Sequence, residues 1–577
     1  MTQCITLLFN RRAIMTAIIK KIKKGKPYYY AVESKRVDGK PRIVWQKYLG
    51  TIDAIIDRTE GTRPQVPKET VIFEAGGVAA LLSIAQLLKL QELINEAVPK
   101  REQGPSVAHY ILLATLNRAL APCSKQAIGD WYASTVLKRL WRLPSSVFSS
   151  QRFWDHMDMV SEQAIERIQE QLIQRIHAAF GIDPRILLYD TTNFFTFLAT
   201  SNGRAVLPQR GHSKAKRHDL RQVGLALLVS KDFQIPLLHH LYPGNTPDVS
   251  LFPQLSKELI ARYNKLTGIC EEATLIFDKG NLSDEVMEKL EFANVGFVAA
   301  LSANRLKDTL STPLDQFKEI PTLPGTLAFT TSQRIWAYQC LVVVAYTESF
   351  FTQQLSGVTT NLVKCQKKLM DLEHHLSKWR QGKARGKQPT IASVRKAVGE
   401  ILTPQFMKDL IQTEINDENG LPRLKYSVNH TALHNLTQHR LGRTMLVSNR
   451  LNWTAQDVIE AYRSLTAVEQ TFKNMKNVDF LRWQPAHHWT DQKLKVHALY
   501  CVLALLLCSL ARKKAYEKGI ELSLPALLKE LTEIREVAVI YPPGTLAHRK
   551  DHITLSRMSP RQLKLANCLQ IQEVLGR

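Results

Sequence analysis

The chain has 577 residues, of which 45% are hydrophobic, so it can bury several cores and we expect a multi-domain α/β protein rather than a disordered one. Lys and Arg number 77 against 52 Asp and Glu, a formal net charge of +25, which favours a polyanionic partner such as nucleic acid. The eight cysteines are scattered without a Cys-x-x-Cys pair, which argues against a disulfide framework and against a structural zinc site.

The sequence gives no sign of a targeting or membrane segment. A short apolar run precedes Arg11 and Arg12, which is the wrong order for a signal peptide, and Met15 is an alternative start. The longest apolar run, residues 498–510, is shorter than the ~20 residues of a membrane span. We therefore expect a buried core helix there, no membrane partner and a cytoplasmic protein.

Residues 25–50 predict a β-hairpin at the start of the chain. Two runs rich in β-branched and aromatic residues flank Asp38-Gly39, which is a strong turn signal. The exposed positions of this hairpin are heavily basic. We assign residues 1–70 to a basic N-terminal β-hairpin region.

Apolar residues recur at helical spacing from about residue 75 to residue 180. We assign residues 71–180 to a helical domain, and one interpretation is that one of its helices reads DNA. A helical pack without that role is the alternative, because no helix-turn-helix signature stands out.

The pattern changes at Gly181, and the elements that follow have the order β-β-β-α-β-α-β. Strands are expected at 185–198, 223–229, 235–241, 273–277 and 296–301, with helices at 248–264 and 284–293. This order matches an RNase H-like core, a mixed sheet in which the first and fourth strands lie side by side. We assign residues 181–302 to the first part of that core.

Two of these strands each deliver an aspartate. Asp190 follows Ile-Leu-Leu-Tyr, and Asp278 follows Ala-Thr-Leu-Ile-Phe. The adjacency of the first and fourth strands brings Asp190 and Asp278 together despite 88 residues of separation. Two hard oxygen ligands close together are what Mg²⁺ requires, and in so basic a chain the expected target is a nucleic-acid phosphodiester.

Residues 303–442 do not continue the core pattern, and we assign them to an insertion between the last core strand and the catalytic helix. The core resumes over 443–512, and 513–577 form a C-terminal helical tail. The insertion contains a basic run that is either a solvated helix face or a DNA contact. This run comprises Lys364, Lys367, Lys368, Lys378, Arg380, Lys383, Arg385, Lys387, Arg395 and Lys396.

A third carboxylate lies on a helix that Thr454 can cap. Tyr462, Glu469 and Lys476 follow at intervals of seven, close to two helical turns, so they stack along one stripe. This arrangement suits metal ligation by Glu469 and a phosphate contact by Lys476. A surface alignment is the alternative, and the two preceding aspartates favour the metal site.

These motifs resemble those of the DDE transposases of bacterial insertion sequences, specifically the insertion-sequence-four superfamily and its branch numbered 1634. The matching segments are Tyr189-Asp190-Thr191, Asp278-Lys279-Gly280 with Ser283, and Tyr462 with Glu469 and Lys476. Leu465 stands where the family has an arginine, which shifts that arginine's role to Arg463, Lys473 or Arg482. The DNA contacts expected from the resemblance are Tyr462, Lys476, Arg463, Lys473, Arg210, Lys214 and Arg217.

The resemblance implies a DNA transposase in which Asp190, Asp278 and Glu469 hold two Mg²⁺ ions, with Mn²⁺ as a substitute. Its partners would be the terminal inverted repeats of an insertion sequence, the target DNA and, in the synaptic complex, a second copy of the chain. It would act on the bacterial nucleoid in the cytoplasm. Two alternatives stay open: an RNase H-like nuclease without strand transfer, and an inactive transposase-derived DNA-binding regulator, which Leu465 would support.

Overall fold

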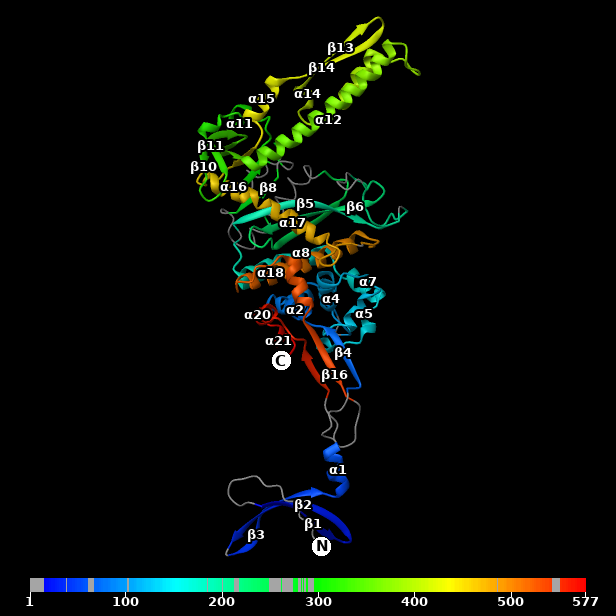
Figure 1. Cartoon of the computed structure of the whole chain (residues 1–577), viewed down its shortest axis with the longest axis vertical. Coiled ribbons are helices and arrows are strands. Elements are labelled where there is room, and N and C mark those ends of the chain that lie inside the picture. Colours follow the sequence, from blue (N-terminus) through cyan, green and yellow to red (C-terminus); the bar gives the residue numbers. More distant parts are fainter. Residues whose placement is uncertain are drawn as a thin grey trace.

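The computed structural model shows a mixed α/β protein of several parts. It describes residues 15–576 except 38, 61–66, 101–102, 184, 200, 212–216, 248–260, 262–272, 279–281, 283, 285–286, 289–294, 485 and 542–550. Most residues of the helices expected at 248–264 and 284–293 lie outside the described residues, and the described residues 261, 284, 287 and 288 are helical. Figure 1 shows an elongated molecule with a small N-terminal sheet at one end and a projecting arm at the other.

The N-terminal sheet has three antiparallel strands and one short helix. They are β1 (Met15–Lys23), β2 (Lys26–Val37), β3 (Lys40–Gly50) and α1 (Ile52–Glu60). Strands β2 and β3 pair up to Val37 and Lys40, which flank the predicted turn, and Asp38 lies outside the described residues. Strand β1 pairs with β2 from Met15 opposite Ser34 to Lys23 opposite Lys26, so the region has one strand more than the predicted hairpin.

A helical scaffold lies between the N-terminal sheet and the central sheet of the chain (Figure 1). Its first half comprises β4 (Glu69–Glu74), α2 (Gly76–Leu87), α3 (Leu90–Ala97), α4 (Val107–Leu120), α5 (Ile128–Ala133), α6 (Leu137–Trp141), α7 (Ser150–Asp158) and α8 (Glu162–Phe180). Its second half comprises α18 (Asp491–Tyr516), α19 (Leu524–Thr532), β16 (Arg535–Ile540), β17 (His552–Leu555), α20 (Pro560–Cys568) and α21 (Ile571–Val574). Helices α4 and α18 are buried along most of their length and pack against each other, which stabilises the scaffold through apolar burial.

Two findings bear on the predictions for the C-terminal half of the scaffold. Helix α18 is long and apolar enough to cross a membrane, but 94% of its apolar window is buried inside the protein, so the predicted core helix is confirmed. The predicted helical tail, 513–577, also contains strands, because β16 pairs with both β17 and β4. Local sequence could not show this pairing, since β4 lies more than 450 residues earlier in the chain.

A nine-stranded mixed sheet forms the centre of the molecule, with the order β10-β11-β12-β15-β9-β8-β5-β6-β7. Its strands on the catalytic side are β5 (Ile186–Thr196), β6 (Arg221–Ser230), β7 (Pro236–Pro243), β8 (Thr274–Phe277), β9 (Gly296–Ala300) and β15 (Arg443–Ser448). Strand β5 is antiparallel to β6 and parallel to β8. The predicted side-by-side arrangement of the first and fourth core strands is therefore confirmed.

Part of the segment assigned to an insertion extends this sheet. Strands β10 (Lys318–Glu319), β11 (Thr326–Ile335) and β12 (Tyr338–Thr347) form its outer edge, and β12 pairs with β15. The remainder forms the arm, which comprises α12 (Glu348–Arg380), α13 (Ile391–Ile401), α14 (Met407–Leu410), β13 (Ile411–Glu418), β14 (Leu421–Val428) and α15 (His430–His439). Sequence analysis placed all of 303–442 outside the core, whereas the structure places only the arm there.

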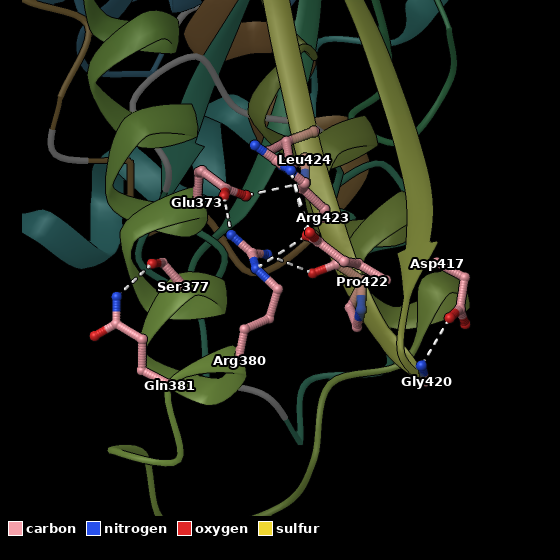
Figure 2. A network of polar contacts seen from close by, with 10 residues as sticks. Glu373, Ser377, Arg380, Gln381, Asp417, Gly420, Pro422, Arg423 and Leu424 are labelled. Carbon is pink, nitrogen blue, oxygen red and sulfur yellow. Dashed lines mark hydrogen bonds and ion pairs between the residues drawn. The ribbon is translucent and has the colours of Figure 1, made fainter.

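The arm has a hydrophobic core of its own. Helix α12 buries Val358, Cys365, Leu369 and Leu376, a 7-4-7 spacing that puts them on one stripe. Figure 2 shows how polar contacts then attach α12 to β14. Arg380 pairs with Glu373 and donates to the Pro422 carbonyl at 2.8 Å, while Glu373 accepts from the Leu424 amide at 2.9 Å.

Candidate active site

Strands β5 and β8 place two aspartates on the same face of the central sheet. Leu188 of β5 pairs with Ile276 of β8. Asp190 lies two residues after Leu188, and Asp278 lies two residues after Ile276. Side chains two residues apart on a strand share a face, and adjacent strands lie about 4.8 Å apart. The predicted proximity of the two carboxylates therefore has a structural basis.

The two aspartates differ in their surroundings. Asp278 is exposed and is the first residue after β8, whereas Asp190 is half-buried in the middle of β5. Asp190 therefore lies within its strand, in agreement with the strand expected at 185–198. It faces Leu227 of β6 on one side, and its own Oδ1 accepts a hydrogen bond from the Thr191 amide at 2.8 Å.

The third carboxylate comes from a pair of helices, α16 (Ala455–Arg463) and α17 (Leu465–Met475). Thr454 caps α16 as predicted. Its Oγ1 accepts a hydrogen bond from the Asp457 amide at 3.2 Å, and the Asp457 carboxylate accepts one from the Thr454 amide at 2.8 Å. The expected single helix is interrupted at Ser464, and Lys476 lies one residue beyond α17. Ser464 keeps a right-handed helical backbone conformation, so the stripe continues across the interruption.

Two hydrogen bonds attach this stripe to the sheet. The Tyr462 hydroxyl donates to Asp278 Oδ1 at 2.9 Å, and the Lys476 ammonium donates to Thr192 Oγ1 at 2.8 Å. Thr192 lies two residues after Asp190 on β5 and shares its face. Glu469, which is exposed, lies between these two attachment points, so the stripe lies over the face that carries Asp190 and Asp278.

The charge around Tyr462 supports the same geometry. Burial raises the pKa of the Tyr462 phenol above its ordinary value, and the charge of Asp278, the hydrogen bond to Asp278 and the charge of Glu469 raise this pKa further. The phenol therefore stays protonated at neutral pH and acts as a hydrogen-bond donor. Asp278 and Glu469 are thus both near enough to Tyr462 for their charges to act on the same phenol.

Three carboxylates from three elements are hard oxygen donors, and this donor set fits a divalent cation such as Mg²⁺. Over the described part of the chain, no three His, Cys, Asp or Glu side chains are gathered closely enough to hold a metal ion. The fold thus brings Asp190, Asp278 and Glu469 to one face without closing them around a metal-sized space.

Comparison with known proteins decides the family. The model of the transposase DDE domain family matches residues 182–507, more than half of the chain and the whole span from Asp190 to Glu469. The chain belongs to the DDE transposase family. The strands and helices that carry the three carboxylates all lie inside this match.

Solved transposase structures resemble this transposase only distantly. A piggyBac transposase synaptic complex with hairpin DNA is 10% identical, with a TM-score of 0.37, and the match covers 78% of this chain and 79% of that one. A Mos1 transposase paired-end complex with the left transposon end is 13% identical, with a TM-score of 0.15, and the match covers 34% and 59%. No curated protein matches this sequence.

The remaining residues predicted to contact DNA lie at different places in the transposase. Lys473 is exposed on α17, while the Arg463 guanidinium donates to Thr326 Oγ1 of β11 at 2.9 Å. Arg210 and Arg217 are exposed, and Arg217 pairs with Asp219 at 2.7 Å. Lys214 lies outside the described residues.

The Arg217 pair has an electrostatic consequence of its own. The Arg217 hydrogen bond, with the charges of Arg217 and Arg210 adding to it, lowers the pKa of Asp219 to about 2. Arg217 therefore has a carboxylate partner in the free transposase and would have to exchange it for a phosphate on binding DNA.

Several aromatic, cysteine and histidine side chains belong to the core. Trp483 is fully buried and stacks on Phe194 with ring centroids 4.4 Å apart, so it supports β5 rather than a nucleotide base. Cys501 and Cys508 are buried, as expected. His239 is buried, and burial lowers its pKa to about 3, so its imidazole is neutral at pH 7.

Two features of the site escaped sequence analysis. Thr192 receives the Lys476 hydrogen bond, and the two-residue spacing from Asp190 was the signal that could have placed it on the active face. Beneath the site, a buried group joins the scaffold to the segment after α17 and contains Arg118, Lys125, His488, His497 and Tyr500. Nothing in the local sequence shows that these five residues meet.

Proposed function

We propose that this transposase binds the terminal inverted repeats of its own insertion sequence, cleaves the DNA at the element's ends and joins the freed 3′-hydroxyl to target DNA. We further propose that its core is RNase H-like and that it belongs to the insertion-sequence-four superfamily, in the branch numbered 1634. The observation that supports the proposal is the pair of hydrogen bonds, Tyr462 to Asp278 and Lys476 to Thr192, which attach the helical stripe that contains Glu469 to the strands that lead to the two aspartates.

Asp190, Asp278 and Glu469 would hold two Mg²⁺ ions, for which Mn²⁺ could substitute. Divalent ions bound there would supply Lewis acidity and charge stabilisation for phosphodiester cleavage and strand transfer. In this assignment Asp190, on the strand paired with β8, would help to hold both ions, while Asp278 and Glu469 would each help to hold one.

The chain's own residues have distinct parts in this site. The Tyr462 hydroxyl, kept protonated by its raised pKa, donates to Asp278 and orients that carboxylate. Lys476 is exposed beside Thr192 and supplies a positive charge where a DNA phosphate would approach the carboxylates. Strand transfer exchanges one phosphodiester for another, so no covalent protein–DNA intermediate is required.

The test is metal-dependent cleavage and strand transfer on DNA that carries the element's own ends. Glu469→Gln should abolish both reactions while end binding persists, because the substitution removes a carboxylate charge and keeps the side chain's shape. Glu460→Gln on α16 is the matched control and should react like wild type, since the Glu460 carboxylate accepts a hydrogen bond from Gln456. Cleavage without joining by the wild type would point to a nuclease.

Two further outcomes separate the alternatives. End-specific binding with no chemistry from the wild type in Mg²⁺ or Mn²⁺ would favour an inactive DNA-binding regulator, in keeping with Leu465 at the family's arginine position. Retention of joining by Glu469→Gln would refute the assignment of the third ligand. The mass of the complex with paired ends would show whether two copies of the chain assemble on DNA, as we propose.

A further inference from the structure

The N-terminal sheet has one covered face and one open face. Exposure alternates along β1: Thr16, Ile18, Lys20 and Ile22 are exposed, whereas the residues between them are half-buried. Ile18 and Ile22 are 61% and 67% exposed, which is unusual for isoleucine in a strand that has a packed partner. The open face is therefore available to a partner.

Tyrosine packing accounts for the covered face. Tyr48 lies against Tyr28 and Tyr30 with ring centroids 6.0 and 5.1 Å apart, and Val32 beside them is buried. Lys21 lies over the Tyr30 ring at 4.9 Å on this side. These contacts give the three strands a small core of their own and leave the opposite face free of it.

Strand register shows which residues share the open face. Opposite residues in antiparallel strands lie on the same side of the sheet. Lys20 lies opposite Tyr29, Ala31 opposite Lys47, Glu33 opposite Trp45 and Lys35 opposite Arg42. The open face thus carries four exposed cations, Lys20, Lys35, Arg42 and Lys47, together with Ile18, Ile22 and Trp45, which is 46% exposed and lies opposite the carboxylate Glu33.

The three strands have a large excess of positive charge. Together they carry nine Lys and Arg residues and a single carboxylate, Glu33. Four of these nine cations, Lys20, Lys35, Arg42 and Lys47, lie on the open face, and they attract a polyanion because each neutralised phosphate releases condensed counterions. Three strands spaced by about 4.8 Å span roughly 10 Å, which is comparable with the major groove of B-DNA at about 12 Å.

Two central helices of the scaffold, α2 and α4, are poorer candidates for reading DNA. Ten of the twelve residues of α2 and thirteen of the fourteen of α4 are buried, so neither helix can enter a groove. The N-terminal sheet, in contrast, lies at the far end of the molecule from the arm and is attached through α1 (Figure 1). Its position leaves the open face accessible to a long ligand.

We propose that the open face of the N-terminal sheet binds duplex DNA in the major groove, with Lys20, Lys35, Arg42 and Lys47 on the phosphates and Trp45 against the base edges. The inference rests on the proposed function only for the choice of DNA, which is the end of the element. It assigns end recognition to the sheet and leaves chemistry to the carboxylates.

The test uses the full chain with Lys35, Arg42 and Lys47 all changed to Gln. Affinity for a duplex carrying the element's end is measured as a function of salt concentration. Removal of three phosphate contacts should reduce the slope of log K against log salt by about 2.7, from ~0.9 for each contact. The charge-keeping set Lys35→Arg, Arg42→Lys and Lys47→Arg should retain the wild-type slope, which shows that the Gln variant fails through charge.

A second triple variant is the matched control for total charge. Lys364, Lys367 and Lys368 are exposed on α12, and changing them to Gln removes the same three charges from the arm. This control should bind DNA with the wild-type slope. Trp45→Ala should reduce the preference for the end sequence over a scrambled duplex without changing the slope.

Three results would overturn the inference: an unchanged slope in the sheet variant, a reduced slope only in the arm variant, or a change of oligomeric state in the sheet variant. The last would mean that a second copy of the chain occupies the face. Metal-dependent nicking of plasmid DNA is measured in parallel. If the wild type binds DNA through the N-terminal sheet but never nicks it, the proposed function is refuted and the inference stands. If the sheet variant nicks normally and its salt slope is unchanged, the inference is refuted and the proposed function stands.

Discussion

The central sheet and the N-terminal sheet use charge in opposite ways. Strands β6, β8 and β9 of the central sheet are almost wholly buried, and the two aspartates on β5 and after β8 are among its few charged positions. The strands of the N-terminal sheet are mostly exposed and carry nine cations. In the central sheet, Asp278 accepts a hydrogen bond from Tyr462 and Asp190 accepts one from the Thr191 amide. In the N-terminal sheet, the charges are numerous and similar.

This difference has a consequence for mutation. A change in the central sheet alters a packed environment with defined partners, so it should act on stability or on the rate of reaction. A change in the N-terminal sheet alters one of several equivalent surface charges, so it should act on affinity and its salt dependence. Four substitutions test this contrast, beginning with the largest expected effect.

Gly224→Ala should severely destabilise the central sheet. Gly224 of β6 lies opposite Tyr242 of β7, and an added Cβ would lie 2.1 Å from the Tyr242 ring, which is itself buried. Overpacking a rigid core site costs about 3 kcal/mol or more when the neighbour has nowhere to move. Urea-induced unfolding should show a large shift in midpoint or no folded protein.

Gly357→Ala provides the control with the same chemical change. Gly357 is exposed in the middle of α12, and an added Cβ there meets nothing within 4 Å. Alanine should stabilise the helix by about 0.5–1 kcal/mol relative to glycine. Equal midpoints for wild type and Gly224→Ala would show that β6 and β7 can separate, which would contradict the rigid packing described above.

The sequence predicted the part of this contrast that depends on local pattern. Alternation and β-branched runs placed the core strands, and their order placed Asp190 beside Asp278. The spacing of Tyr462, Glu469 and Lys476 predicted a stripe that the structure retains. These features are set by residues within one element or by a known order of elements.

Long-range pairing was beyond the sequence pattern. The pairing of β12 with β15 draws residues from the assigned insertion into the sheet, and β16 pairs with β4 from the opposite end of the chain. The helix interruption at Ser464 could not be predicted, because no Gly or Pro lies there in the sequence. The contact of Arg463 with Thr326 likewise depends on β11, whose position in the sheet no local pattern gives.

Tyr462→Phe should slow cleavage while leaving DNA binding unchanged. The substitution removes the hydroxyl that donates to Asp278 at 2.9 Å but keeps the ring in place. Loss of an orienting hydrogen bond of this kind costs about 1.4–2.7 kcal/mol, or 10- to 100-fold in single-turnover rate. The ratio of the wild-type to the Tyr462→Phe cleavage rate should be the same at pH 7 and pH 9, because the raised pKa of Tyr462 keeps the wild-type phenol protonated at both pH values.

The control for this substitution is Tyr516→Phe, since the Tyr516 side chain is 51% exposed at the end of α18. It should cleave at the wild-type rate. A Tyr462→Phe factor that disappears at pH 9 would mean that the phenol ionises in that range, contrary to the environment described for it.

Arg380→Ala should loosen the arm without affecting the central sheet. Arg380 is only 17% exposed, pairs with Glu373 and donates to Pro422 of β14 (Figure 2). Removal of a half-buried charged donor costs about 2 kcal/mol locally. Hydrogen exchange should quicken in β13 and β14 and stay unchanged in β5 and β6.

Arg423→Ala is the control in the same strand pair. Arg423 is 49% exposed and its partner Glu418 is 44% exposed, so little stability depends on that pair. Exchange in β13 and β14 should hardly change. Faster exchange across the central sheet in Arg380→Ala would show that the arm and the sheet unfold together.

The last comparison makes one substitution in two regions, Lys125→Met in the scaffold and Lys35→Met in the N-terminal sheet. Lys125 is buried, its ammonium lies 4.2 Å from the centre of the Tyr500 ring, and it has no hydrogen-bond partner among the described residues. Burial, with the charge of Arg118 adding to it, lowers the pKa of Lys125 well below its ordinary value. Methionine keeps the volume and removes the buried amine.

The sign of the pH dependence follows from the lowered pKa. The unfolded chain binds a proton on Lys125 below about pH 10.4, whereas the folded protein does so only at a lower pH. Wild-type stability therefore falls as the pH drops from about 10 to 7, and Lys125→Met escapes this loss. The variant should be more stable by about 1 kcal/mol at pH 7 and by less at pH 9.5, as measured by urea unfolding.

Lys35→Met should show neither effect, because Lys35 is exposed in both the folded and the unfolded chain. Its unfolding midpoint should match wild type at both pH values, while its affinity for duplex DNA should fall. If Lys125→Met were less stable than wild type at pH 7, the buried ammonium would be charged and stabilised by the Tyr500 ring. The scaffold would then use a cation as a stabilising contact. The contrast between a buried lysine that lowers stability and an exposed lysine that contributes to DNA binding would no longer hold.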